Sequence, residues 1–249
     1  MVRKVLTWTG IVLGSFALLL GVEVYLAYTR EYLPTSPAIE IGGTFGPRDG
    51  RPLTFVVLGD STAAGLGAGS AEHAYATVLS ERLGRRGWKV DLLAHGESGA
   101  RVKDVLVEQT PIAERAEADL VFVGIGANDA THLTSLDSIK EDMSATLDRL
   151  LGTGATVVVA GPPDMRAHAW LEPLRSIVGW RGRQVAAAIE DVAVERGVPV
   201  VPLAELAGPY FASHPEDAYA SDDFHPGPGG YRAWADAIFP VLLDALQNR

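Results

Sequence analysis

Residues 53–69 read LTFVVLGDSTAAGLGAG. The run Leu53–Leu58 is apolar and rich in β-branched side chains, which is typical of a strand buried on both faces of a sheet. It ends in Gly59, Asp60 and Ser61, where the glycine allows the backbone to turn sharply. Because open α/β sheets place their ligands beyond the carboxyl ends of the strands, Ser61 is a candidate nucleophile. A serine hydroxyl is weak by itself and needs a general base, usually a histidine that a carboxylate orients.

After this stretch the chain alternates strand-like and helix-like segments. The predicted strands are Leu53–Leu58, Lys89–Ala94, Asp119–Ile125, Thr156–Ala160 and Pro199–Pro202. The predicted helices are Ala71–Arg86, Val102–Arg115, Leu136–Leu151, Leu174–Glu195 and Gly230–Leu246. This alternation predicts an α/β fold in which crossover helices connect the strands of a parallel sheet.

The amino-terminal residues 1–30 are predicted to form a membrane anchor. Arg3 and Lys4 precede the apolar stretch Val5–Tyr28, which as a helix would span roughly 36 Å at about 1.5 Å per residue. A bilayer core is about 30 Å thick, so one crossing fits. The basic end favours the cytoplasmic side, which predicts that the remainder of the chain is extracytoplasmic. A cleaved signal segment with secretion of the remainder is an alternative, and a buried soluble helix is another.

Three units follow from this organisation. Residues 1–30 are the anchor or signal segment, residues 31–52 a linker rich in proline and glycine, and residues 53–249 the folded domain. With 47% apolar and 21% charged residues, the chain has the composition of a globular domain.

Charge and cysteine content exclude several classes of function. The formal net charge is -10, and binding to nucleic acid requires a basic face, so we expect no nucleic-acid partner. The chain has no cysteine, which excludes thiol nucleophiles, disulfides and zinc-thiolate sites.

Four polar or glycine-rich segments follow predicted strands or precede the last predicted helix. They are Gly-Asp-Ser at 59–61, His-Gly-Glu-Ser-Gly at 95–99, Gly-Ala-Asn-Asp at 126–129 and Asp-Asp-Phe-His at 222–225. Because parallel strands end at the same edge of a sheet, these segments are expected to converge there as an active site.

The order and residue types of these segments resemble the SGNH hydrolases, also called the GDSL esterase and lipase family. The resemblance rests on Gly-Asp-Ser, on Gly99, on Gly-x-Asn-Asp and on Asp-x-x-His, and it runs from about Thr54 to the carboxyl terminus. His95 departs from it, because the family often has asparagine there. The resemblance implies a three-layer α/β/α sandwich whose five-stranded parallel sheet has a flavodoxin-like order, with no metal or organic cofactor.

The same resemblance implies a role for each matching residue. Ser61 would be the nucleophile, His225 the general base and Asp222 the carboxylate that orients the imidazole, with Asp223 a less well spaced competitor for this role. The oxyanion hole would consist of the backbone N–H groups of Ser61 and Gly99 and the side-chain amide of Asn128.

The predicted function is hydrolysis of carboxylic esters, either acetyl or short to medium acyl esters of lipids or glycans, through an acyl-serine intermediate. One alternative is an acyltransferase that moves the acyl group to a sugar or lipid hydroxyl. The other is a non-catalytic binding module anchored to the membrane by the amino-terminal helix. Two long segments rich in aromatic residues, Pro162–Pro173 and Gly208–Ser221, are expected to be loops that wall the binding site.

Overall fold

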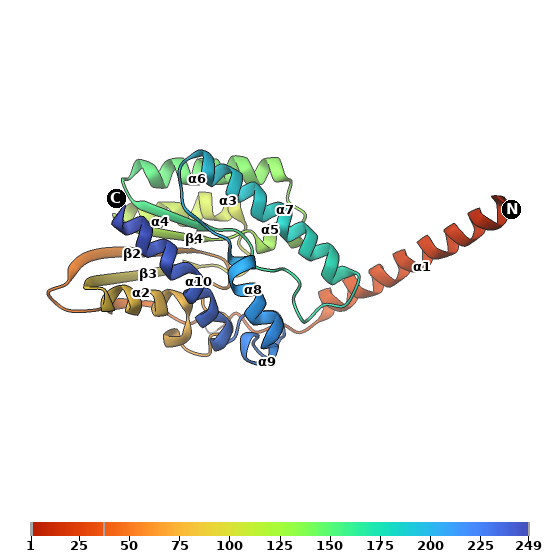
Figure 1. The fold of residues 1–249 in the computed structure, drawn as a ribbon, viewed down its shortest axis with the longest axis horizontal. Coiled ribbons are helices and arrows are strands. Elements are labelled where there is room, and N and C mark those ends of the chain that lie inside the picture. The colour runs from red at the N-terminus through yellow and green to blue at the C-terminus, as the bar shows by residue number, and fades with distance from the viewer. Residues whose placement is uncertain (1, 37, 249) are drawn as a thin grey trace.

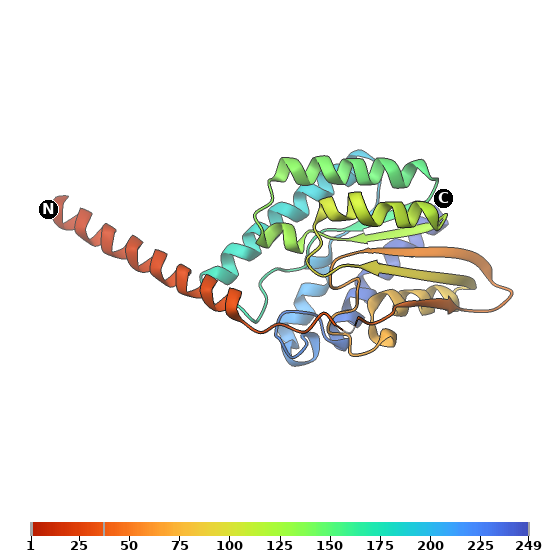
Figure 2. The same ribbon diagram turned by 180° about the vertical axis from the view of Figure 1, so that it is seen from behind.

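The computed structural model describes residues 2–36 and 38–248. A six-stranded sheet with the order β1-β3-β2-β4-β5-β6 lies between two layers of helices (Figure 1, Figure 2). The strands are β1 (Gly42–Phe45), β2 (Arg51–Gly59), β3 (Trp88–Gly96), β4 (Leu120–Gly124), β5 (Thr156–Ala160) and β6 (Val200–Val201).

The five predicted parallel strands are all present as β2 to β6, and their order is flavodoxin-like. The sheet has one more strand than expected, because β1 pairs antiparallel with β3 from Gly42 opposite Leu93 to Phe45 opposite Val90. This strand lies within residues 31–52, so part of the expected linker belongs to the sheet. A four-residue strand that begins with two glycines has little β propensity of its own, which explains why its sequence did not reveal it.

Helices cover both faces of the sheet (Figure 1, Figure 2). One face carries α2 (Tyr75–Arg85), α8 (Leu203–Ser213) and α10 (Pro228–Gln247). The other carries α3 (Val102–Asp104), the π-helical turn η2 (Val105–Gln109), α4 (Thr110–Arg115), α6 (Leu136–Gly152) and α7 (Leu174–Glu195). Because both faces are covered, the central strands are buried on both sides, as the apolar run at Leu53–Leu58 predicts.

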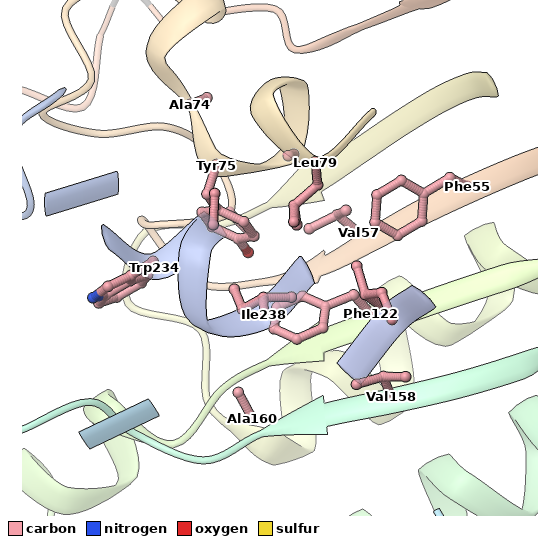
Figure 3. Packing of buried hydrophobic residues seen from close by; sticks show 14 of the residues in the cluster. Phe55, Val57, Ala74, Tyr75, Leu79, Phe122, Val158, Ala160, Trp234 and Ile238 are labelled. Carbon is pink, nitrogen blue, oxygen red and sulfur yellow. The ribbon is translucent and has the colours of Figure 1, made fainter. Parts of the chain in front are cut away.

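Figure 3 shows the core between the sheet and the layer of α2 and α10. The side chains that meet there are Phe55, Val57, Phe122, Val158, Tyr75, Leu79, Trp234 and Ile238. Tyr75 packs edge-on against Phe122 with 5.9 Å between ring centroids. This is an offset geometry that aromatic pairs favour.

The helical layer differs from expectation in two places. The predicted helix Val102–Arg115 is divided into α3, η2 and α4. The predicted loop Gly208–Ser221 is wrong over most of its length, because α8 continues to Ser213 and a further short helix covers Pro215–Ala218. The sequence did not predict this part of α8 because Pro209 lies inside it, and a proline in a helix interior normally disfavours the helix. Three short helices, η1 (Ala71–His73), α5 (Ala127–Thr131) and α9 (Pro215–Ala218), also form.

The π-helical turn η2 places a buried glutamine against the end of strand β2. The side chain of Gln109 donates through Nε2 to the carbonyl of Gly59, and its Oε1 accepts from the N–H of Gly59, both at 2.8 Å. A single side chain therefore binds both backbone groups of the residue at which β2 ends. Single-turn π segments are frequent near functional sites, and this one supports the turn that carries Ser61.

The helix α1 (Val2–Thr29) projects away from the domain (Figure 1, Figure 2). Within the described part of the chain, Leu6–Thr29 is long and apolar enough to cross a membrane. The carboxyl-terminal turns of α1 contact the domain. The buried carboxylate of Glu23 accepts a hydrogen bond from the N–H of Leu174, at the start of α7, at 2.9 Å. A carboxylate at a helix amino terminus satisfies an otherwise unpaired N–H and is favoured by the helix dipole.

We expect Gln109→Ala to lower the free energy of unfolding by about 1–3 kcal/mol, because it leaves the buried N–H of Gly59 without an acceptor. The matched control is Glu108→Ala at the exposed neighbouring position, which should change it by less than about 0.5 kcal/mol. Thermal and urea unfolding of the full chain in detergent measure both. Equal stability of the two variants would contradict the role assigned to Gln109.

Candidate active site

Ser61 stands on a turn that packs against bare backbone. Gly59, Gly96 and Gly124 lie side by side at the carboxyl ends of β2, β3 and β4, where Gly59 pairs with the other two. A Cβ added at Gly96 would lie 2.2 Å from the backbone nitrogen of Ala64 and 2.4 Å from the carbonyl oxygen of Asp60. The turn that presents Ser61 can therefore reach the end of β3 only because Gly96 carries no side chain.

Asp60 holds this turn in shape. Its Oδ1 accepts the N–H of Thr62 at 2.9 Å and the hydroxyl of Thr62 at 2.8 Å. Burial raises the pKa of the Asp60 carboxyl, and the hydrogen bonds from Thr62 offset only part of this effect. The side chain of Asp60 thus binds the backbone two residues further on, as aspartates in turns commonly do.

The structure brings Ser61 together with Asp222 and His225, although Ser61 lies 164 residues before His225 in the sequence. The Oγ of Ser61 lies 3.2 Å from Nε2 of His225, and Nδ1 of His225 lies 2.7 Å from Oδ2 of Asp222. Ser61 and His225 are 9% and 7% exposed, so this chain of contacts is largely shielded from water. The arrangement is that of a nucleophile, a base and a carboxylate that orients the base.

The carboxylate of Asp222 is stabilised in its ionised form. Burial acts to raise its pKa, but the hydrogen bonds from the His225 side chain and from the backbone N–H groups of His225 and Phe224 outweigh it and lower the pKa to about 2. Those two N–H groups donate to Oδ1 at 3.0 and 3.1 Å. Asp223 has a different partner, because its Oδ2 pairs with Arg30 at 2.9 Å. Of the two neighbouring aspartates, the structure places Asp222 against the imidazole.

The residues expected to form the oxyanion hole lie on neighbouring loops. Gly99 follows β3 with a φ of +88°, a conformation that glycine adopts without strain. Asn128 donates through Nδ2 to the carbonyl of Ala100 at 3.0 Å, which joins α5 to the loop of Gly99. An amide NH₂ has two donors, so this contact leaves one available. Among the described residues, no acceptor is found for the backbone N–H of Ser61 or of Gly99.

An apolar cavity opens beside Ser61 and His225. Asn128 lines its wall, whereas Gly99 does not. The apolar lining includes Tyr75, Phe122, Pro162, Pro163, Met165, Leu203, Ala207, Phe211, Tyr219, Phe224, Trp234 and Ile238. Both segments that the sequence predicts as walls of a binding site contribute to this list, which confirms their place at the cavity.

The sequence matches the GDSL-like Lipase/Acylhydrolase family over residues 57–233. The chain belongs to this family. A GDSL-like esterase of Mycobacterium tuberculosis is 33% identical over 199 residues, which cover 78% of this chain and 63% of that protein. The match thus spans less than two thirds of the length of this relative.

Solved structures of other proteins have the same fold. A family 3 carbohydrate esterase of Clostridium thermocellum superposes with a TM-score of 0.64 at 20% identity, over 80% of this chain and 98% of its own. A lipase/acylhydrolase of Enterococcus faecalis superposes with a TM-score of 0.62 at 17% identity, over 76% and 94%. These similarities confirm the SGNH hydrolase fold that the motifs predict.

Two contacts near the candidate site were not foreseen from the sequence. Gln109 lies within a predicted helix, where a lone glutamine carries no signal of a long-range contact. Arg30 follows an apolar run, where a basic residue is commonly attributed to the membrane boundary rather than to a site.

We expect Gly96→Ala to lower the free energy of unfolding by about 1–3 kcal/mol, because the added methyl group meets backbone atoms that must move. The substitution should also slow the reaction of Ser61 with a fluorophosphonate, because the turn that carries Ser61 moves when these backbone atoms move. Gly152→Ala is the control, because a Cβ at this helical position meets nothing within 4 Å. If both variants unfolded at the same temperature and reacted at the same rate, the close-approach argument would fail.

Proposed function

We propose that this protein hydrolyses carboxylic esters through an acyl-serine intermediate. The observation that supports this most strongly is the chain of contacts from Ser61 through His225 to an ionised Asp222, beside an apolar cavity. Family membership supports the same class of reaction.

In the proposed mechanism, Nε2 of His225 removes the proton of the Ser61 hydroxyl as Oγ attacks the ester carbonyl carbon. Asp222 stays ionised and stabilises the imidazolium that forms. The tetrahedral intermediate collapses, and the departing alkoxide takes the proton from His225. Water then attacks the acyl-serine in the same way, which releases the acid and returns the proton to Ser61.

The developing oxyanion would be stabilised by the N–H groups of Ser61 and Gly99 and by the amide of Asn128. Donors fixed in place before the reaction need no reorganisation when charge develops. Removal of one such donor typically costs about 2.7–4 kcal/mol of transition-state stabilisation.

We propose that the cavity binds an acyl group of short to medium length. Its lining between α8 and α10 is aliphatic and aromatic, and each buried methylene contributes about 0.8 kcal/mol. The alcohol part of the ester could belong to a lipid or to a glycan, since the fold is common to a carbohydrate esterase and to a lipase/acylhydrolase. We further propose that α1 is a membrane anchor and that the domain is extracytoplasmic.

The first test is Ser61→Ala in the full chain, which should abolish hydrolysis of p-nitrophenyl butyrate while thermal unfolding stays unchanged. Ser70→Ala, at a partly exposed serine outside the cavity lining, is the control. Equal rates for wild type and Ser61→Ala would indicate a non-catalytic binding module. If added alcohol or sugar yields more new ester than free acid, the protein is an acyltransferase.

Asp222→Asn should lower kcat by about 10⁴, because the asparagine amide favours the wrong tautomer of His225. Asp223→Asn should lower it far less, by about tenfold at most, because Asp223 does not contact the imidazole. Steady-state kinetics at neutral pH measure both. A larger loss for Asp223→Asn would mean that the assignment of the orienting carboxylate is wrong.

Substitution within the cavity should change the preferred acyl length. Ala207 lines the cavity on α8, and Ala207→Leu should lower kcat/KM for octanoyl esters while sparing acetyl esters. Glu205→Leu, on the exposed side of the same helix, is the matched control. Rates for p-nitrophenyl esters of graded length measure the effect, and an unchanged length profile would exclude this cavity as the acyl site.

A further inference from the structure

We propose that the segment that leaves the membrane helix, Arg30–Leu33, positions the catalytic loop Asp222–His225. This inference rests on the proposed function, because it concerns how the same active site is held in its working geometry. It assigns to the junction between anchor and domain a role beyond tethering.

The guanidinium of Arg30 forms hydrogen bonds with the backbone of this loop. Its Nε and Nη2 donate to the carbonyl of Asp222 at 3.2 and 3.0 Å, and Nη2 also pairs with Oδ2 of Asp223 at 2.9 Å. Nη1 lies 3.5 Å from the carbonyl of Ala169 on the neighbouring segment. A planar fork with several donors fixes orientation as well as distance, which a single hydrogen bond does not.

A second contact reaches the catalytic carboxylate itself. The backbone N–H of Leu33 donates to Oδ2 of Asp222 at 3.3 Å, and this oxygen also accepts Nδ1 of His225 at 2.7 Å. The loop's own N–H groups bind Oδ1. The remaining side of the carboxylate is therefore bound by a residue that follows the membrane helix.

Aromatic contacts continue this connection to the imidazole. Tyr32 packs edge-on against Phe224 at 5.2 Å, and Phe224 packs edge-on against His225 at 4.9 Å between ring centroids. The hydroxyl of Tyr32 accepts the indole N–H of Trp170 at 3.2 Å. Each ring limits the movement of the next, so a displacement of Arg30–Leu33 would change the position of the His225 imidazole.

The helix end that carries this segment is itself docked. Glu23 binds the N–H of Leu174 on α7, and Arg30 binds the catalytic loop seven residues later. These two attachment points lie about 10 Å apart along the chain. The junction is thus bound to the domain at both ends.

The test uses the full chain in detergent with p-nitrophenyl butyrate as substrate. Arg30→Ala should lower kcat by about tenfold with KM changed by less than about twofold, because the loop is displaced while the cavity stays intact. Arg30→Lys should restore part of the loss. The control is Arg196→Ala, whose guanidinium also makes several hydrogen bonds, to Asp148 and Ser144 in the opposite helical layer.

The rate at which a fluorophosphonate labels Ser61 gives a second readout, since it follows activation of the nucleophile. Slower labelling of Arg30→Ala than of Arg196→Ala, at equal thermal stability, would support the proposal. If wild type reacts and Arg30→Ala matches it within twofold, the positioning role is wrong while the proposed function stands. Equal losses for both variants, in step with stability, would also overturn it. Failure of wild type to react would remove the proposed function and this inference together.

Discussion

The close approach of the Ser61 turn to the end of strand β3 is the constraint on which the rest of the site depends. Gly96 carries no side chain at the point where the turn crosses the sheet, and a Cβ there would lie 2.2 Å from the backbone nitrogen of Ala64. A side chain at Gly96 would meet the backbone of Asp60 and Ala64 and push the turn, with Ser61, away from the sheet. Because Ser61 and His225 are 164 residues apart in the sequence, their side chains lie at 3.2 Å only when the turn keeps this position.

The orientation of His225 depends on the hydrogen bonds that stabilise the charge of Asp222. Both carboxylate oxygens accept hydrogen bonds, from the imidazole and from backbone N–H groups on two separate segments. Burial alone would favour the neutral acid, so these donors keep the group ionised. The same contacts that stabilise the charge also fix the direction of the carboxylate, which links electrostatics to geometry in this site.

Much of the fold could be predicted because buried parallel strands leave long apolar runs, as at Leu53–Leu58. The convergence of Ser61, Asp222 and His225 could be predicted because each residue lies in a recognisable motif beside a strand or helix end. The features that could not be predicted, strand β1 and the contact of Gln109 with Gly59, depend on residues far apart in the sequence. Strand β1 has no apolar pattern and forms only against β3. The contact of Gln109 with Gly59 requires a π-helical turn, which has no signature in the hydrophobic periodicity.

Strand β1 has a consequence for any soluble version of this protein. It is an edge strand of the sheet, at the end opposite β6, and pairs with the side of β3 that faces away from β2. A chain that began at residue 53 would lose it and expose the N–H and C=O groups of β3 to other molecules. Unprotected strand edges recruit further strands and promote aggregation. The smallest well-behaved fragment should therefore begin before Gly42, inside the stretch whose composition resembles a linker.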